Sequence, residues 1–127
     1  MKENEIAKEV VDAAFRVHTK LGPGLLESVY EVVLAHEIKK RGLSVIRQKP
    51  VPVKYDNMVF NKGFRADIVV EDSVILELKS IEATSPVHKK QLLTYLRLTD
   101  KKLGLLINFG APLITHGISR IVNGLKD

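Results

Sequence analysis

The sequence of 127 residues contains no cysteine and no tryptophan. The absence of cysteine excludes disulfide bonds, thiolate metal ligands and a cysteine nucleophile. No apolar run approaches the ~20 residues that span a bilayer, and residues 1–5 lead into no apolar segment typical of a secretory signal. We therefore expect a cytoplasmic protein without a membrane partner. The length and the hydrophobic fraction of 45% predict one globular domain over residues 1–127.

The 20 basic and 15 acidic side chains are unevenly distributed along the chain. Residues 39–54 contain six Lys and Arg side chains and no acid, and residues 84–102 contain five against one acid. Clustered positive charge is typical of proteins that bind polyanions, although it is equally typical of a solvated surface that keeps a protein soluble. The candidates for contacts with a nucleic-acid backbone are Lys39, Lys40, Arg41, Arg47, Lys49, Lys89 and Lys90.

Hydrophobic periodicity predicts two helices in the first third of the chain. The first covers residues 5–20 and ends at the turn-forming segment 21–24, Leu-Gly-Pro-Gly. The second covers residues 25–41 and is followed by Gly42, a residue typical of helix C-termini. Its apolar side chains, which we expect in the core, include Leu26, Val29 and Val33.

The rest of the chain is patterned mainly for strands. We predict strands over residues 43–48, 51–55, 58–70, 74–79, 102–108 and 113–121, and one helix from Ser85-Pro86 to about Leu98. Pro50 and Pro52 indicate an exposed sheet edge, and Gly63 indicates a bend or bulge. The resulting order, ααββββαββ, predicts an α/β or α+β domain built on a mixed sheet.

Two carboxylates are expected to face each other in this sheet. If residues 71–73 form a three-residue hairpin loop, Asp67 lies directly across from Glu77. Side chains alternate along a strand, so Asp67, Glu77 and Lys79 share one face, while their apolar neighbours point into the core. Opposed carboxylates repel each other, and a bound cation or a shared proton is the usual agent that offsets the repulsion.

The chemistry of this group suits a divalent metal ion. Asp and Glu oxygens together with a backbone carbonyl are ligands for Mg²⁺ or Mn²⁺. Lys79 would hold a positive charge where a water or phosphate oxygen could meet it, which indicates metal-assisted attack on a phosphodiester. The alternative is a surface strand with a Glu–Lys ion pair of little consequence.

Three further polar residues could complete such a site. Glu27 lies in the first turn of the second predicted helix, where the helix dipole favours an ionised carboxylate that could bind metal. Gln91 and Tyr95 are four residues apart on the third predicted helix and project from one face of it. Each of the three is also an ordinary residue for a helix surface.

Several of these residues resemble known motifs. Residues 24–30, Gly-Leu-Leu-Glu-Ser-Val-Tyr, resemble the signature of the bacterial GxxExxY protein family, which belongs to the PD-(D/E)XK nuclease-like superfamily. The superfamily pattern falls on Asp67 and on residues 77–79, Glu-Leu-Lys, with Ala66 in place of the proline. Residues 91–95 resemble the QxxxY element of the RecB-like and lambda-exonuclease-like branch. The resemblance covers nearly the whole chain and implies a restriction-endonuclease-like core, with a mixed sheet flanked by helices.

The residues and the resemblance together lead to a first hypothesis, a Mg²⁺- or Mn²⁺-dependent nuclease that acts on DNA. The sequence shows no recognition helix or zinc module that would read bases, so we expect selection by the shape of the substrate rather than by its sequence. The implied metal ligands are Glu27, Asp67, Glu77 and the carbonyl of Leu78. Lys79 would orient the attacking water, while Gln91 and Tyr95 would position the scissile strand or the lysine. The alternative is a binding module for nucleic acid or protein on the same fold, without turnover. The short chain also suits a homodimer.

Overall fold

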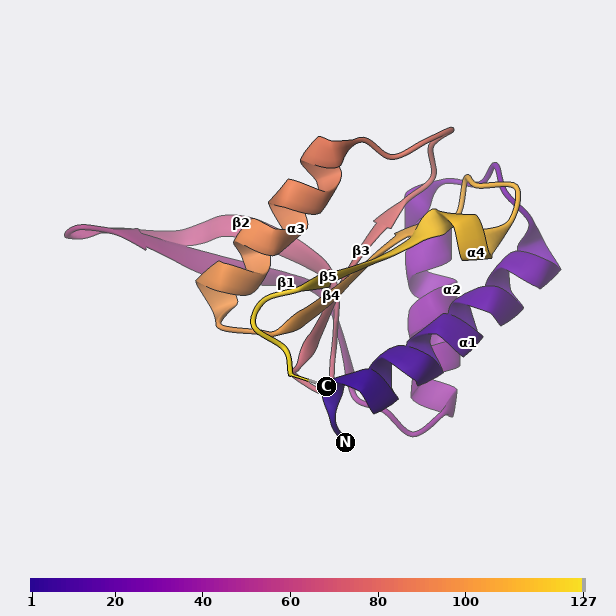
Figure 1. Cartoon of the computed structure of the whole chain (residues 1–127), viewed down its shortest axis with the longest axis horizontal. Coiled ribbons are helices and arrows are strands. Elements are labelled where there is room, and N and C mark those ends of the chain that lie inside the picture. Colours follow the sequence, from indigo (N-terminus) through magenta and orange to yellow (C-terminus); the bar gives the residue numbers. More distant parts are fainter. Residues whose placement is uncertain (127) are drawn as a thin grey trace.

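The computed structural model describes residues 1–126, which form one five-stranded mixed sheet and four helices (Figure 1). In chain order the elements are α1 (Glu3–Leu21), α2 (Glu27–Lys40), β1 (Val45–Tyr55), β2 (Met58–Val70), β3 (Val74–Lys79), α3 (Pro86–Thr99), β4 (Leu103–Asn108), α4 (Ile114–Gly117) and β5 (Ile118–Val122). The strands lie in the order β1-β2-β3-β4-β5, with β3 and β4 parallel and the other neighbours antiparallel. The predicted fold class, a mixed sheet flanked by helices, is confirmed. No helix in residues 1–126 is both long and apolar enough to cross a bilayer.

Helices cover both faces of the sheet (Figure 1). Helices α1, α2 and α4 pack on one face, over the larger hydrophobic core, to which Leu34 and Phe109 contribute. Helix α3 packs on the other face, where Leu92 and Leu96 contact a smaller cluster that includes Leu106 of β4. The central strands are therefore buried on both sides, which makes the backbone around β3 and β4 the most enclosed part of the fold.

The alternation of side chains along β3 divides its residues between the two layers. Those that enter the larger core are Val74, Leu76 and Leu78. Ile75 enters the smaller core beneath α3, and Glu77 and Lys79 follow it at intervals of two residues. The prediction that Glu77 and Lys79 share one face of this strand, opposite Val74, Leu76 and Leu78, is confirmed.

The interior face of α2 differs from the prediction. The helix begins at Glu27, and its first buried side chain is Tyr30. Leu26 and Val29 were expected in the core, but they are 74% and 39% exposed, so this prediction is wrong for both. Leu26 is the N-cap residue, with extended backbone at φ −68° and ψ 148°, so its side chain lies outside the helical repeat. Val29 directly precedes the inward-facing Tyr30, about 100° away around the helix axis, and therefore points to the side. Val33 packs against the core as expected.

Two strand predictions are also corrected, and the observed order is ααβββαβαβ. The strands predicted over residues 43–48 and 51–55 are one continuous strand, β1, although Gln48, which adopts a positive φ of 53°, and Pro52 are missing from its ladder with β2. The segment 113–121 is not one strand, because helix α4 precedes β5. Helix α4 ends at Gly117, which packs closely on the end of β4: an added Cβ there would lie 2.4 Å from the carbonyl oxygen of Asn108. A helix of one turn is too short to leave a periodic signal in the sequence.

The hairpin of β1 and β2 has the exposed edge predicted from Pro50 and Pro52 and the bulge predicted at Gly63. β1 is an edge strand of the sheet. The β1–β2 register shifts between Val51 and Val53, beside Gly63. The side chain of Val53 occupies the space over Gly63, since an added Cβ there would lie 2.0 Å from Val53 Cγ2. A bulge next to a glycine allows this close approach of two strands.

Candidate active site

Asp67 and Glu77 occupy opposed positions at the end of the β2–β3 ladder. The ladder pairs Ile68 with Leu76, and continuing this register by one residue places Asp67 across from Glu77. The backbone N–H of Leu78 donates a hydrogen bond of 2.8 Å to Asp67 Oδ2. The three-residue loop and the register predicted from it are therefore confirmed, and the two carboxyls lie beside each other.

Burial makes this pair electrostatically costly. The pKa of Glu77 is raised to about 8, first by burial and then by the neighbouring Asp67 carboxyl. Burial likewise raises the pKa of Asp67, although the hydrogen bond from Leu78 opposes the shift. Among the residues that the structure describes, Glu77 Oε1 is the one buried side-chain oxygen or nitrogen without a hydrogen-bond partner. Such an atom is costly in a protein interior unless a cation or a proton satisfies it.

Lys79 lies two residues beyond Glu77 on the same face of β3 and is half-buried. Its positive charge lowers the pKa of both Asp67 and Glu77, which partly opposes the effects of burial. The strand is held in place at this point from the other side, because the N–H of Phe109 donates a 2.8 Å hydrogen bond to the carbonyl of Lys79. The predicted group of two carboxylates and one lysine is thus assembled on two neighbouring strands, Asp67 on β2 and Glu77 and Lys79 on β3.

Tyr95 of α3 lies close to the two carboxyls, as predicted. Burial, followed by the negative charges of Glu77 and Asp67, raises the pKa of its hydroxyl. Its ring stacks on Phe64 of β2, with the ring centroids 3.9 Å apart and the planes 6° from parallel. Gln91 is exposed one turn earlier on the same helix, and no contact in the described part of the chain joins it to the carboxyls.

Glu27 lines a cleft to which neither carboxyl of the pair contributes. Its side chain is exposed, and the cleft, which is open and about 760 Å³ in volume, is also lined by the loop after β3 and the loop before α4. Ser80, the residue after Lys79, closes one side of the cleft by donating a 2.5 Å hydrogen bond to the carbonyl of Leu25. No three His, Asp or Glu side chains in residues 1–126 are arranged to hold one metal ion. A role for Glu27 as a metal ligand, direct or through water, stays a prediction.

Glu31 is the residue at this site that the sequence reasoning missed. It is buried on α2, one turn after Glu27, and its charge contributes to the raised pKa of Asp67. Arg47 donates two hydrogen bonds to Glu31 Oε2, from Nε at 3.0 Å and from Nη2 at 2.7 Å. Gln48 Nε2 donates to the other oxygen at 2.5 Å. The four-residue spacing from Glu27 is the signal that could have indicated it.

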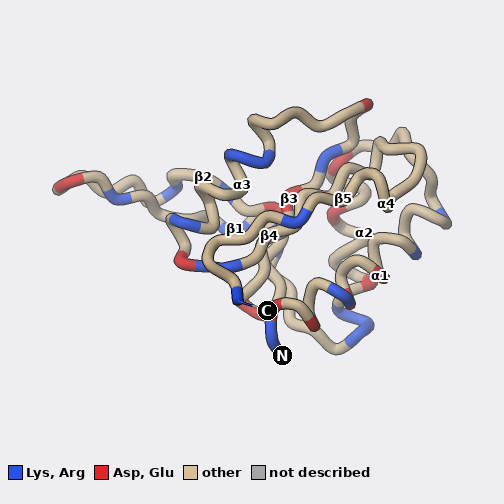
Figure 2. The backbone as a smooth tube through the Cα atoms, in the orientation of Figure 1, with Lys and Arg blue, Asp and Glu red and all other residues tan. Residues whose placement is uncertain are grey.

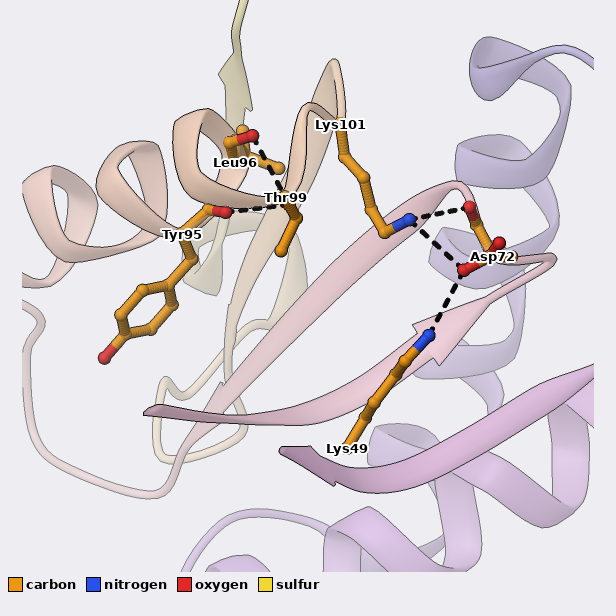
Figure 3. Close-up of polar contacts among 6 residues, drawn as sticks. All are labelled: Lys49, Asp72, Tyr95, Leu96, Thr99 and Lys101. Atoms are coloured by element: carbon orange, nitrogen blue, oxygen red, sulfur yellow. Dashed lines mark hydrogen bonds and ion pairs between the residues drawn. The ribbon is translucent and has the colours of Figure 1, made fainter. Parts of the chain in front are cut away.

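Some of the predicted nucleic-acid contacts are occupied by internal partners. Arg47 is bound to Glu31, as described above. Lys49 Nζ lies 3.3 Å from Asp72 Oδ1 in the β2–β3 turn, and Lys101 Nζ lies 3.2 Å from the same oxygen (Figure 3). Arg41 lies 3.0 Å from Glu9 of α1. These ion pairs fasten neighbouring elements together and reduce the positive charge available to a polyanion.

The remaining predicted basic residues do not form a single surface. Lys39 and Lys40 end α2 on one face of the sheet, whereas Lys89 and Lys90 lie in the first half of α3 on the other face (Figures 1 and 2). All four are exposed. Their roles as contacts for a nucleic-acid backbone stay predictions, and the two pairs would have to contact different parts of a ligand.

The fold and site together define an α+β domain in which β2 and β3 present a half-buried carboxyl pair and a lysine. A family model described as the PD-(D/E)XK nuclease superfamily matches residues 4–121, and the chain belongs to that superfamily. This confirms the resemblance read from the Asp67 and Glu77-Leu78-Lys79 motif. Comparisons with curated proteins and with solved structures found no match. The narrower relation to the GxxExxY family stays a prediction.

Proposed function

We propose that the protein is a divalent-metal-dependent phosphodiester hydrolase that cleaves nucleic acid, with DNA as the expected substrate. One observation carries the proposal: Glu77 Oε1 is buried without a partner beside the Asp67 carboxyl, on the strand that also presents Lys79. Two adjacent buried carboxyls destabilise a fold unless something offsets their repulsion. Membership of the nuclease superfamily supports the proposal independently.

The residues present fit a divalent ion of the Mg²⁺ or Mn²⁺ type. Asp67 and Glu77 would supply carboxylate oxygens and Leu78 a backbone carbonyl, which is a donor set of hard oxygens. Because no third carboxylate joins them in the described chain, water would complete the coordination, and Glu27 would act through such a water. The bound ion would serve as a Lewis acid that offsets the charge of the carboxylates and of the phosphate.

The protein's own side chains would supply the remaining chemistry. Lys79 would orient the attacking water and stabilise the negative charge that develops on the phosphate. The Tyr95 hydroxyl, held by the stack on Phe64, would contact the scissile strand or Lys79. Gln91 would contact the substrate from the exposed turn before it. None of these groups reads base edges, which favours selection by the shape of the substrate rather than by its sequence.

The test is metal-dependent cleavage of labelled single-stranded, duplex, flapped and four-way DNA, with RNA in parallel. We expect products with Mg²⁺ or Mn²⁺ and none in EDTA. Glu77→Gln and Lys79→Met should each reduce the rate by about 100-fold or more, since each removes a charge that acts on the transition state. Glu5→Gln and Lys20→Met, which change exposed side chains on α1, are the matched controls and should cleave like the wild type.

Cleavage that survives Glu77→Gln would show either a contaminating nuclease or a different site, and the proposal would fail. If the wild type cleaves none of these substrates and binds no Mn²⁺, the alternative is favoured, namely a non-catalytic module that binds nucleic acid or protein. Light scattering of the same samples tests the expected homodimer.

A further inference from the structure

The hairpin of β1 and β2 extends far beyond the rest of the sheet (Figure 1). β2 pairs with β3 only from Ile68 to Val70, whereas its pairing with β1 continues to Met58 at the turn. Residues 51–65 therefore pair only within the hairpin, and we call this segment the arm. A two-stranded ribbon is at best marginally stable by itself in water, so an arm of this length calls for an explanation.

The end of the arm is apolar and exposed. Tyr55 and Val59 are 66% and 57% exposed, and Met58 and Phe60 are 51% and 52% exposed. Single exposed apolar residues are ordinary, but a contiguous group at the end of a projecting element is typical of a binding surface.

The aromatic residues of the arm form a row that leads back to the candidate active site. Cross-strand partners lie on the same face of a hairpin, so Tyr55 joins Met58, and Phe60 joins Val53 on that face. Phe64 continues the row at the base of the arm, where it stacks on Tyr95 of α3. The row thus runs from the tip of the hairpin to the ring that lies beside Glu77 and Asp67.

The charge of the arm favours an anionic occupant. Lys54, Lys62 and Arg65 lie along it, against one acid, Asp56 at the turn (Figure 2). Lys54 and Arg65 are each next in sequence to an aromatic residue, so they leave the ribbon on the face opposite the aromatic row. All three basic side chains are exposed, and within residues 1–126 none of them makes an ion pair. A second copy of the chain would bring like charges together if it paired arm against arm, whereas a phosphate backbone would neutralise them.

We propose that the arm binds a single-stranded segment of nucleic acid, with unpaired bases stacked on Tyr55 and Phe60. Its phosphates would contact Lys62 and also Lys54, whose long side chain reaches them around the free edge of β1. A basic track beside spaced aromatic rings is the combination that binds single strands, because every base offers a face for stacking. The strand then leads along the aromatic row toward Tyr95. This inference rests on the proposed function for its class of substrate, and it specifies strands that are already single or frayed at an end.

The first test is the affinity for a fluorescein-labelled single-stranded oligonucleotide, measured by anisotropy in EDTA so that no cleavage occurs. Phe60→Ser should weaken binding roughly 10-fold, and Tyr55→Ser similarly, since each removes one stacking ring. The matched control is Phe15→Ser on α1, where the phenylalanine is 55% exposed on the opposite side of the fold. This control should bind like the wild type, and thermal melts should show that all of the variants are folded.

The second test is the dependence of affinity on salt. The double variant Lys54→Gln/Lys62→Gln should reduce the slope of log K against log salt concentration by about 1.4, which is ~0.7 for each lost phosphate contact to a single strand. Lys8→Gln/Lys20→Gln on α1 removes the same charge elsewhere and should leave the slope close to that of the wild type.

Unchanged affinity and salt slope in the arm variants would overturn the inference. So would a wild-type dimer that becomes monomeric in Phe60→Ser without loss of binding, because the arm would then be a surface for self-association. The proposed function fails separately: a protein that binds strands through the arm but cuts nothing with Mg²⁺ refutes hydrolysis and supports the arm. If the arm variants cleave nucleic acid as fast as the wild type and bind it as tightly, the inference about the arm fails while the proposed hydrolysis stands.

Discussion

Ionisation of the Glu77 side chain opposes folding. In the folded protein its pKa is about 8, compared with an ordinary value of 4.5, because it is buried beside Asp67. The folded state therefore retains a proton that the unfolded chain releases between these two values. Stability from this group is fully present below about pH 4.5 and is lost as the pH rises through about 8.

The metal-free protein should accordingly become less stable between pH 5 and pH 8. Each unit of pH in this window should lower the free energy of unfolding by about 1.4 kcal/mol through Glu77. Glu77→Gln removes the titration while keeping the shape of the side chain, so the variant should lose less stability over the same range and exceed the wild type at pH 8. Urea unfolding in EDTA at several pH values measures both effects, with Glu5→Gln as the control. Parallel pH profiles for the wild type and Glu77→Gln would contradict this account.

At the scale of elements, the loop that follows β3 is fixed to the end of β4 by one side chain. Asn108 is buried, and its Oδ1 accepts hydrogen bonds from the N–H groups of Ile81 at 3.1 Å and Gly110 at 3.0 Å. Its Nδ2 donates to the carbonyl of Ile81 at 2.9 Å. The two loops approach so closely that a Cβ on Gly110 would lie 2.1 Å from that carbonyl oxygen. Asn108 thus fixes the backbone two residues after Lys79.

Asn108→Ala should destabilise the protein by about 3 kcal/mol, since it removes three hydrogen bonds worth about 1 kcal/mol each and leaves buried partners unsatisfied. Urea unfolding is the measurement. Asn123→Ala, which removes one hydrogen bond of 3.0 Å to the carbonyl of Lys101, is the matched control and should cost about 1 kcal/mol. Equal effects of the two substitutions would show that the two loops are not held by Asn108.

At the scale of the whole molecule, stability is unevenly distributed. β3 and β4 lie between two layers of helices, and each pairs with a neighbour on both sides. The arm formed by residues 51–65 lacks a third strand, and most of its side chains are exposed. Local opening should therefore cost much less in the arm than in the centre of the sheet.

Native-state hydrogen exchange should reveal this difference directly. Amides of β3 and β4 should exchange only through global unfolding, whereas amides of the arm should exchange through local opening that is much less sensitive to denaturant. Adding a single-stranded oligonucleotide should protect the arm selectively. Equal protection of the arm and of β4 in the free protein would contradict this distribution of stability.

The elements that sequence patterns predicted well are those governed by local rules. The β2 and β3 boundaries, the loop 71–73 and the facing positions of Asp67 and Glu77 follow from alternation and loop length, which act over a few residues. Helix α4 was not predicted, because one turn of helix has no measurable period. The exposure of Leu26 was not predicted either, because α2 begins one residue later, at Glu27, and helix boundaries are only weakly marked in a sequence.

The sequence by itself determined that Glu77 and Lys79 share one face of β3, because the apolar alternation of that strand leaves them together, and that Asp67 of β2 lies across from Glu77. Only the tertiary structure decided which distant groups would join them. The packing of α2 against the sheet brings Glu31 to Arg47 and places Glu27 in a separate cleft. Such contacts depend on the angles between packed elements and on the twist of the sheet, and these are set by the whole core rather than by any local run of residues.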